Sequence, residues 1–272
     1  MRPLNSLVLD GASEPLFFSD VHLGEECPSL TEPFLAWLDK VLASSKTVFI
    51  LGDLFNAWIG DDLLEQDRLF PETVLAARAV CQKLKAFTEA EGAAYFMAGN
   101  RDFLIGPNFF NRSGLRPIAQ ECLLQFAGSR WLLCHGDHLC IDDRPHQDLR
   151  SRLLSPEWQA EFLATSLVSR AAFATTLREK SQAAKAMKAE EIMDVNRDEC
   201  LRRVRHHECI GLIHGHTHRP GSYPMAEGLM RWVIPDWHTR PNKETQADPG
   251  AADCTGGFLR LTDAGPEIIR VS

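Results

Sequence analysis

Five short polar clusters in this sequence carry side chains of the types that bind metal ions. Each cluster closely follows an apolar run with the composition of a buried strand, at residues 16–18, 48–51, 94–97, 131–134 and 210–213. Two divalent ions about 3.5–4 Å apart need a bridging carboxylate and further donors on either side. The clusters supply seven such side chains, namely Asp20, His22, Asp53, Asn100, His135, His216 and His218. Their chemistry is that of a two-metal hydrolytic site.

The candidate ligands include both nitrogen and oxygen donors. A mixed set of this kind suits Mn²⁺, Fe²⁺ or Zn²⁺ better than Ca²⁺, which prefers oxygen alone. A single Asp-x-His or His-x-His is more often an ordinary polar turn. Here every cluster has the strand context that a metal site requires, which argues against five coincidental polar loops.

The strand-like runs are the elements that must bring the clusters together. Because loops at strand ends carry the chemistry of rigid scaffolds, we predict that all five clusters emerge at the same edge of a buried sheet. Helices are predicted at residues 33–43 and 71–91, and further strands at 230–234, 257–261 and 267–271. This alternation predicts an α/β (α+β) fold in which helices flank two packed sheets.

The order of these motifs resembles the calcineurin-like metallophosphoesterase superfamily over residues 16–238. The resemblance implies a single domain over residues 1–272, folded as a four-layer αββα sandwich with a helical cap insert at residues 144–207. It also implies two divalent ions, for which we predict Mn²⁺. One ion would be held by Asp20, His22, Asp53 and His218. The other would share Asp53 as the bridge and add Asn100, His135 and His216.

Longer stretches at residues 51–62, 99–104, 192–196 and 214–220 are similar to the branch of this superfamily that acts in lipid A biosynthesis. That similarity implies hydrolysis of the diphosphate of UDP-2,3-diacylglucosamine by metal-activated water at the α-phosphorus, giving UMP and 2,3-diacylglucosamine 1-phosphate. The catalytic residues would be Asn100, Arg101 and His216. The substrate contacts would be Asn100, Arg101, Asp143, Ser181, Lys185, Lys188 and His216. Asn56 departs from the pattern, because Glu is expected there.

The insert between the fourth and fifth clusters is expected to be helical. Ser155 before Pro156 is a plausible helix start, and Trp158, Phe162 and Leu167 follow an amphipathic period. This apolar stripe either packs onto the core or accommodates acyl chains, whose burial gains about 0.8 kcal/mol per methylene. Positions 181, 185 and 188 are spaced by four and three, so they share one helix face.

Composition and charge restrict the function further. A formal net charge of −8 argues against a nucleic-acid enzyme with a broad basic surface. The eight cysteines show no C-x-x-C pair, which favours reduced thiols in the cytoplasm. No window approaches about 18 apolar residues, and the start lacks a signal-peptide pattern. Membrane contact would therefore be peripheral, and the resemblance implies the cytoplasmic face of the inner membrane.

Three other functions remain open at this point. The chain could be a different calcineurin-like phosphoesterase acting on soluble nucleotides or phosphoproteins, a nuclease, or a non-catalytic scaffold of the same fold. Loss of metal ligands would mark a scaffold, and none is missing. Among the other polar residues, we expect surface or capping roles for His138, His146, His206 and His207. We expect His214 to be a core or ligand-supporting group, and Asp102 to support its loop.

Overall fold

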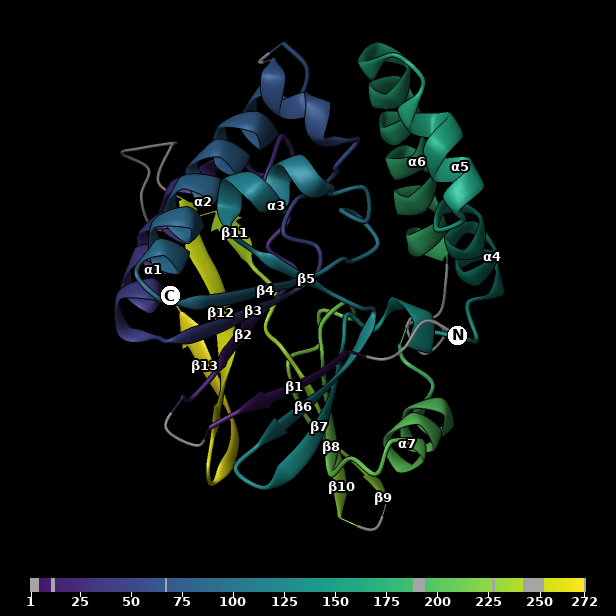
Figure 1. Ribbon diagram of the computed structural model, residues 1–272. Coiled ribbons are helices and arrows are strands. Elements are labelled where there is room, and N and C mark those ends of the chain that lie inside the picture. The colour runs from purple at the N-terminus through teal and green to yellow at the C-terminus, as the bar shows by residue number, and fades with distance from the viewer. Residues whose placement is uncertain are drawn as a thin grey trace.

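The computed structural model describes residues 5–10, 13–66, 68–187, 194–226, 228–241 and 252–271, with the backbone alone at 5, 182–187, 240–241 and 252–253. Two mixed β-sheets pack face to face at its centre, and helices cover their outer faces (Figure 1). The first three clusters follow strands of one sheet, and the last two follow strands of the other.

The first sheet has seven strands in the order β11-β12-β2-β3-β4-β5, with β13 also paired to β12. The parallel strands are β2 (Leu16–Phe18), β3 (Thr47–Leu51), β4 (Ala93–Met97) and β5 (Arg116–Ile118). The antiparallel strands are β11 (His238–Pro241), β12 (Ala252–Thr262) and β13 (Gly265–Val271). Because β2, β3 and β4 run in the same direction, the clusters that follow them meet at one edge.

The second sheet has six strands in the order β1-β6-β7-β8-β10-β9. Its strands are β1 (Asn5–Leu9), β6 (Glu121–Phe126), β7 (Ser129–Cys134), β8 (Gly211–His214), β9 (Gly221–Ala226) and β10 (Leu229–Val233). β7 and β8 are parallel neighbours, so the fourth and fifth clusters also meet. The prediction that all five clusters share the edge of one sheet is wrong, because the chain leaves the first sheet after β5 and enters the second at β6.

Side chains alternate between two cores along the strands of the first sheet. Phe18 and Ile50 lie in a cluster with the helices, whereas Phe17 and Phe49 point between the sheets and join Leu212 of β8. The rings of Phe17 and Phe49 stack with their centroids 4.9 Å apart. Alternation with a period of two therefore buries both faces of the sheet.

Helices form the outer layers. α1 (Thr31–Ser44), α2 (Pro71–Glu89) and α3 (Pro107–Ser113) lie on the first sheet, and α7 (Arg197–His206) lies on the second (Figure 1). α1 buries Phe34, Trp37 and Leu38 at helical spacing, and α7 buries Cys200 and Val204. The order of layers is thus helix, sheet, sheet, helix, which confirms the predicted αββα sandwich.

A group of three helices stands apart from the sandwich layers. α4 (Arg144–Leu153), α5 (Pro156–Leu163) and α6 (Leu167–Met187) project beside the edge at which the clusters meet (Figure 1). The Ser155 hydroxyl accepts a hydrogen bond from Trp158 N at 3.2 Å, which caps α5 where the sequence placed its start. We call α4, α5 and α6 the cap. α7 also falls within residues 144–207, but it packs on β8 and β9.

Two further sequence features have structural counterparts. All eight cysteines are free, and burial raises the pKa of the Cys122 thiol to about 12. Within the described ranges, no helix is both long enough and apolar enough to cross a bilayer.

Candidate metal centre

The first group of ligand atoms is formed by Asp20, His22 and His218, which come from two different sheets. His218 Nε2 lies 3.5 Å from Asp20 Oδ1 and 3.3 Å from His22 Nε2. His22 Nε2 lies 4.0 Å from Asp20 Oδ1. The three side chains therefore converge on one small volume.

The second group contains Asp53, His135 and His216, whose ligand atoms lie within 4.8 Å of one another. Asn100 joins them, because its Oδ1 lies 3.1 Å from His135 Nε2. Asp53 Oδ2 lies between the groups, 3.7 Å from His135 Nε2 and 3.9 Å from His22 Nε2. The structure thus brings together all seven side chains that the sequence singled out, with Asp53 in the middle.

Backbone strain is concentrated at these residues. Five of the candidate ligands have φ in the left-handed region, namely Asp20 (53°), His22 (56°), Asp53 (56°), His216 (68°) and His218 (53°). Non-glycine residues seldom adopt this conformation, and they keep it only where contacts with the surrounding structure outweigh its strain. The left-handed conformation at these turns therefore directs the five side chains toward a common point.

Glycines in the motifs make room for the carboxylates. A Cβ at Gly99 would lie 2.1 Å from Asp53 Oδ1, and a Cβ at Gly215 would lie 2.2 Å from Asp20 Oδ2. Any side chain at either position would displace a candidate ligand. This close approach explains why glycine precedes Asn100 and His216.

The two buried aspartates are held by directed hydrogen bonds. Asp20 Oδ2 accepts from Ser19 Oγ at 2.6 Å and from His216 N at 2.8 Å, and Asp53 Oδ1 accepts from Arg101 N at 2.9 Å. Asp20 Oδ1 is also buried, yet it accepts no hydrogen bond. An oxygen left in this state beside two imidazoles fits a cation ligand, since burying an unsatisfied polar atom otherwise costs free energy.

The electrostatics of the centre also suit a bound dication. Burial alone would raise the pKa of Asp20, but the neighbouring His218, His135 and His22 lower it below its ordinary value. Burial lowers the pKa of His22 to about 4, so this imidazole is neutral and able to bind metal. Burial acts in the same direction on His135, but Asp53 and Asp20 raise its pKa to about 9. Without metal, positive charge on neighbouring histidines thus offsets the buried carboxylates, and a bound dication would take over that role.

Asp102 supports the loop, as the sequence predicted. Its two oxygens accept hydrogen bonds from Gly99 N at 2.8 Å and from Leu54 N at 2.7 Å. These bonds tie the loop after β4 to the loop after β3. Burial and the nearby Asp53 raise the pKa of Asp102 to about 7.

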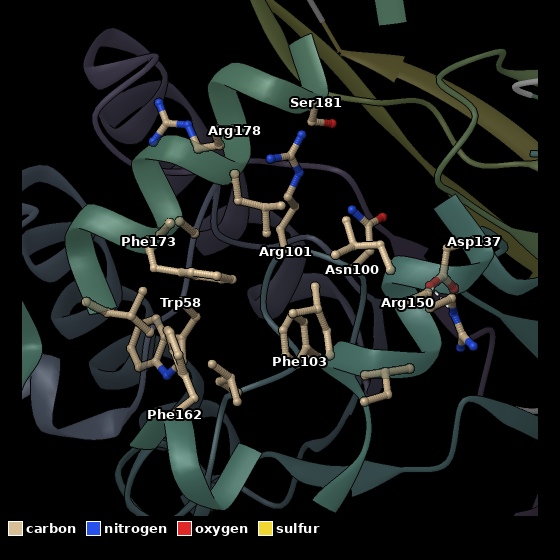
Figure 2. Close-up of a pocket in the computed structure, with 18 of the residues that line it drawn as sticks. Trp58, Asn100, Arg101, Phe103, Asp137, Arg150, Phe162, Phe173, Arg178 and Ser181 are labelled. Carbon is tan, nitrogen blue, oxygen red and sulfur yellow. Dashed lines mark hydrogen bonds and ion pairs between the residues drawn. The ribbon is translucent and has the colours of Figure 1, made fainter. Parts of the chain in front are cut away.

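A pocket adjoins the metal centre and separates it from the cap. Its empty space is about 850 Å³, part of which is open to solvent. The polar end includes Asn100, Arg101 and Arg150 (Figure 2). The rest of the lining is largely apolar and includes five aromatic side chains, namely Trp58, Phe103, Trp158, Phe162 and Phe173. One cavity thus connects Asn100, a candidate metal ligand, with an apolar wall.

The aromatic wall of the cap is a packed cluster rather than a set of loose side chains. Trp158 and Phe162 stack with centroids 4.6 Å apart, and Phe173 meets Phe162 edge-on at 5.2 Å. Phe173 is still 37% exposed, and Phe162 also packs against the main core. These rings therefore offer apolar surface to the pocket.

The predicted substrate contacts lie in different places. Arg101 and Ser181 line the pocket, and the Arg101 side chain extends toward α6 (Figure 2). Asp143 is buried and accepts a hydrogen bond from His146 N at 3.2 Å, so it caps α4. Lys185 belongs to α6, of which only the backbone is described there, and Lys188 lies outside the described residues.

Some residues around the centre were missed or underrated in the sequence. His146 was expected to have a surface or helix-capping role, but it lines the pocket and its ring centroid lies 5.6 Å from that of His216. Asp236 Oδ2 lies 3.3 Å from His218 Nδ1. Neither residue belongs to a motif, and only long-range packing brings each to the site. The spacing of His146, three residues after Asp143 in a helix start, was the one available signal.

The remaining polar candidates are structural. His138 Nε2 lies 3.0 Å from Glu121 Oε1, and the His206 and His207 rings meet each other 4.7 Å apart. His214 is a buried core residue whose Nδ1 lies 2.9 Å from Gly215 O. Asn56, the departure from the expected pattern, is buried and contributes to the pocket wall.

The fold and the metal centre agree with the family comparison. The model for calcineurin-like phosphoesterases matches residues 15–220, and the chain belongs to this family. It is 41% identical to a UDP-2,3-diacylglucosamine hydrolase of Cellvibrio japonicus, over 82% of this chain and 90% of that protein. A protein of the same name from Haemophilus ducreyi is 39% identical over 84% of this chain and 93% of its own length. The family resemblance seen in the sequence is thus confirmed.

Solved structures of similar shape are much more distant. An archaeal phosphodiesterase aligns with a TM-score of 0.41 and 10% identity, covering 95% of this chain and 99% of that one. Vps29 from Entamoeba histolytica, complexed with zinc, aligns with a TM-score of 0.39 and 13% identity over 94% and 97% of the two chains. The assignment of the fold therefore rests on the sheets described above and on the family match.

Proposed function

We propose that this protein hydrolyses the diphosphate of UDP-2,3-diacylglucosamine at the α-phosphorus, giving UMP and 2,3-diacylglucosamine 1-phosphate for lipid A biosynthesis. Relatives of about 40% identity are named UDP-2,3-diacylglucosamine hydrolase, which supports this substrate. The observation that carries the proposal is the single pocket in which Asn100 and Arg101 lie at one end and the aromatic cap side chains at the other. A substrate with a diphosphate and two acyl chains needs both ends.

Two divalent ions, for which we propose Mn²⁺, would be held by the seven ligands described above. When bound, such ions supply Lewis acidity and a nucleophile at neutral pH. The protein contributes the geometry, because the strained turns and the hydrogen bonds to Asp20 and Asp53 fix the carboxylates before any ion arrives. Asp53 would bridge, since its Oδ2 lies within reach of both histidine groups.

Arg101 and Asn100 would bind the phosphoryl oxygens. The loop that carries them is fixed through Asp102 and through the hydrogen bond from Arg101 N to Asp53. With its backbone held in this way, Arg101 would direct its guanidinium to donate to phosphate in a planar, charge-assisted geometry. His216 would orient the phosphate as well as bind metal. The sugar phosphate that leaves has a last ionisation near pH ~6, so it departs without a strong general acid.

The rest of the substrate would contact the cap side of the pocket. We propose that Ser181 and Lys185 of α6, together with Lys188, bind the sugar or its substituents, and that Asp143 contributes at the nucleotide or sugar. The acyl chains would lie along the aromatic wall. We further propose that residues 1–272 act as one domain in the cytoplasm, with the substrate drawn from the inner-membrane surface. The net charge of −8 favours this over a nucleic-acid partner.

A comparison of substrates tests the proposal. Purified protein with Mn²⁺ should hydrolyse UDP-2,3-diacylglucosamine far faster than UDP-glucosamine without acyl chains, because only the former uses the apolar end of the pocket. Release of UMP measures both rates. Equal rates on the two substrates, or a preference for soluble nucleotides such as dinucleoside polyphosphates, would favour the alternative that this is a phosphoesterase of soluble substrates.

A further inference from the structure

Asp236 lies beyond the region that the family model matches, yet it touches the metal centre. It follows β10 in the short connection to β11, and its side chain is 17% exposed. Asp236 Oδ2 lies 3.3 Å from His218 Nδ1 and 3.4 Å from His238 Nδ1. A carboxylate therefore sits directly behind one of the candidate ligands.

The other nitrogen of His218 faces the candidate ligands. His218 Nε2 lies 3.5 Å from Asp20 Oδ1 and 3.3 Å from His22 Nε2. A neutral imidazole has one nitrogen that donates and one that accepts. If Nδ1 donates its hydrogen to Asp236, then the lone pair of Nε2 is directed into the group formed by Asp20 and His22.

Asp236 is itself held in place by its neighbours. Trp237 N donates to Asp20 O at 3.1 Å, and Trp237 Nε1 donates to Gly257 O at 3.1 Å. His238, which shares Asp236 Oδ2, has its Nε2 2.9 Å from Thr255 Oγ1. The connection between β10 and β11 is thus hydrogen-bonded both to Asp20 in the loop after β2 and to β12. These bonds hold the Asp236 carboxylate next to His218.

The second group of ligands uses a different support. His135 Nδ1 lies 2.8 Å from the backbone oxygen of Leu51, and its Nε2 faces Asn100 and Asp53. A backbone oxygen fixes the tautomer but carries no charge. The two ion positions therefore differ in the partner behind one histidine, which is a carboxylate for the first and a peptide oxygen for the second.

We propose that Asp236 is a positioning residue that holds His218 with Nε2 toward the ion of Asp20 and His22, and thereby determines the affinity of that ion. This inference rests on the two-ion centre of the proposed function. Removal of a carboxylate behind a metal-bound histidine typically weakens metal affinity by about 10- to 100-fold. Only one of the two ions should be affected, because His135 does not depend on Asp236.

Metal binding to the metal-free protein tests the inference without any activity assay. Mn²⁺ is titrated into wild type, Asp236→Ala, Asp236→Asn and the control Asp263→Ala, and bound ions are counted by EPR and elemental analysis. Asp263 is an exposed aspartate in the turn between β12 and β13. We expect two ions in wild type and in the control. In Asp236→Ala one ion should bind about 10- to 100-fold more weakly and the other unchanged.

Asp236→Asn separates positioning from a general structural role. The amide oxygen still accepts the Nδ1 hydrogen, so this variant should recover part of the affinity lost in Asp236→Ala. The ¹⁵N shifts of His218 in the proteins loaded with diamagnetic Zn²⁺, where a ligating ring is neutral, report which nitrogen carries the hydrogen, and Nδ1 should carry it in wild type and in Asp236→Asn. Wild-type affinity for both ions in Asp236→Ala and Asp236→Asn would overturn the inference. If wild type itself fails to bind two ions, the metal centre of the proposed function is wrong instead.

Discussion

At the scale of single residues, Asp53 occupies the position on which both groups of ligands depend. Its Oδ2 faces His22 on one side and His135 on the other, while its Oδ1 holds the backbone of Arg101. One carboxylate thus links the two ion positions to the phosphate-binding loop. The energetic cost of its loss should therefore appear in metal binding and catalysis before it appears in folding.

We predict that Asp53→Ala abolishes phosphoanhydride hydrolysis and lowers the occupancy of both ions. Asp53→Asn is the matched control for the loop, because its amide oxygen can still accept the hydrogen bond from Arg101 N while the negative charge is removed. Both variants should lose activity by more than about 10³-fold, which is about 4 kcal/mol of barrier. Elemental analysis and circular dichroism provide the measurements. Normal metal content in either variant would contradict a bridging role.

A second prediction concerns the bond that is broken. Hydrolysis in ¹⁸O-labelled water should place the label in UMP, because attack occurs at the uridine-side phosphorus. Mass spectrometry of both products measures its position. Label in the sugar phosphate would show attack at the other phosphorus, and the roles assigned to Arg101 and His216 would then be incorrect.

At the scale of elements, one arginine fastens the cap to the sandwich. Arg170 near the start of α6 is 3% exposed, and its guanidinium donates to Ile59 O at 2.5 Å and to Thr165 O at 3.1 Å. It also forms a two-pronged ion pair with Asp62 of the 3₁₀ turn η2 (Asp61–Glu65). A second ion pair, Arg178 with Glu26, ties the same helix to the loop after β2, which also carries Asp20 and His22. α6 is therefore held at two points along its length.

We predict that Arg170→Lys loosens the cap without disturbing the metal centre. Lysine keeps the charge but cannot reproduce the forked set of hydrogen bonds. The value of kcat/KM for the diacyl substrate should fall about tenfold, equivalent to about 1.4 kcal/mol, mainly through KM. Hydrolysis of bis(p-nitrophenyl) phosphate should stay within about twofold of wild type. The exposed Arg152 on α4 offers a matched control as Arg152→Lys, and similar losses in both variants would argue against the anchor.

The aromatic wall of the cap leads to a separate prediction. Polar substitutions at Trp158, Phe162 or Phe173 should weaken hydrolysis of the diacyl substrate by about tenfold for each ~1.4 kcal/mol of lost burial. A short phosphodiester, which needs only the metal end of the pocket, should be affected far less. Phe173 is the best position because it is partly exposed, whereas Phe162 also packs on the core. Thermal melts must accompany the kinetics. If folded variants lose activity equally on both substrates, the aromatic side chains serve packing and do not bind acyl chains.

At the scale of the whole molecule, the metal centre joins the two sheets. Asp20 and Asp53 follow strands of the first sheet, and His135, His216 and His218 follow strands of the second. Ions bound there would link the two sheets, and they would do so only in the folded protein. Metal binding should therefore contribute directly to the free energy of unfolding.

We predict that chelation lowers the melting temperature and that Mn²⁺ restores it. One ion at 100 times its dissociation constant adds about 2.7 kcal/mol, which corresponds to roughly 5–10 °C for a chain of this size. Calorimetry with EDTA and with excess Mn²⁺ gives the shift, and Asp53→Ala should show much less of it. The same melting temperature in both conditions would mean that the ions do not link the sheets.

The sequence by itself determined the local features of this protein. The seven candidate ligands, the apolar runs before them, the capped start of α5 and the amphipathic stripe of the cap are all patterns within a few residues. Each follows from side-chain chemistry and a fixed period, so the alternation of helices and strands and the two-metal ligand set could be predicted from them. The family resemblance added the αββα sandwich and the assignment of the ligands to two ions.

Only the tertiary structure decided how distant segments meet. It distributed the five clusters over two sheets, used Asp143 as a helix cap, and brought His146 and Asp236 to the centre. These outcomes depend on strand order and on the packing of residues far apart in the chain, such as Asp236 against His218 and Arg170 against Asp62. No local period in the sequence predicts such contacts, because the free energy of packing depends on both surfaces that meet and not on one segment alone.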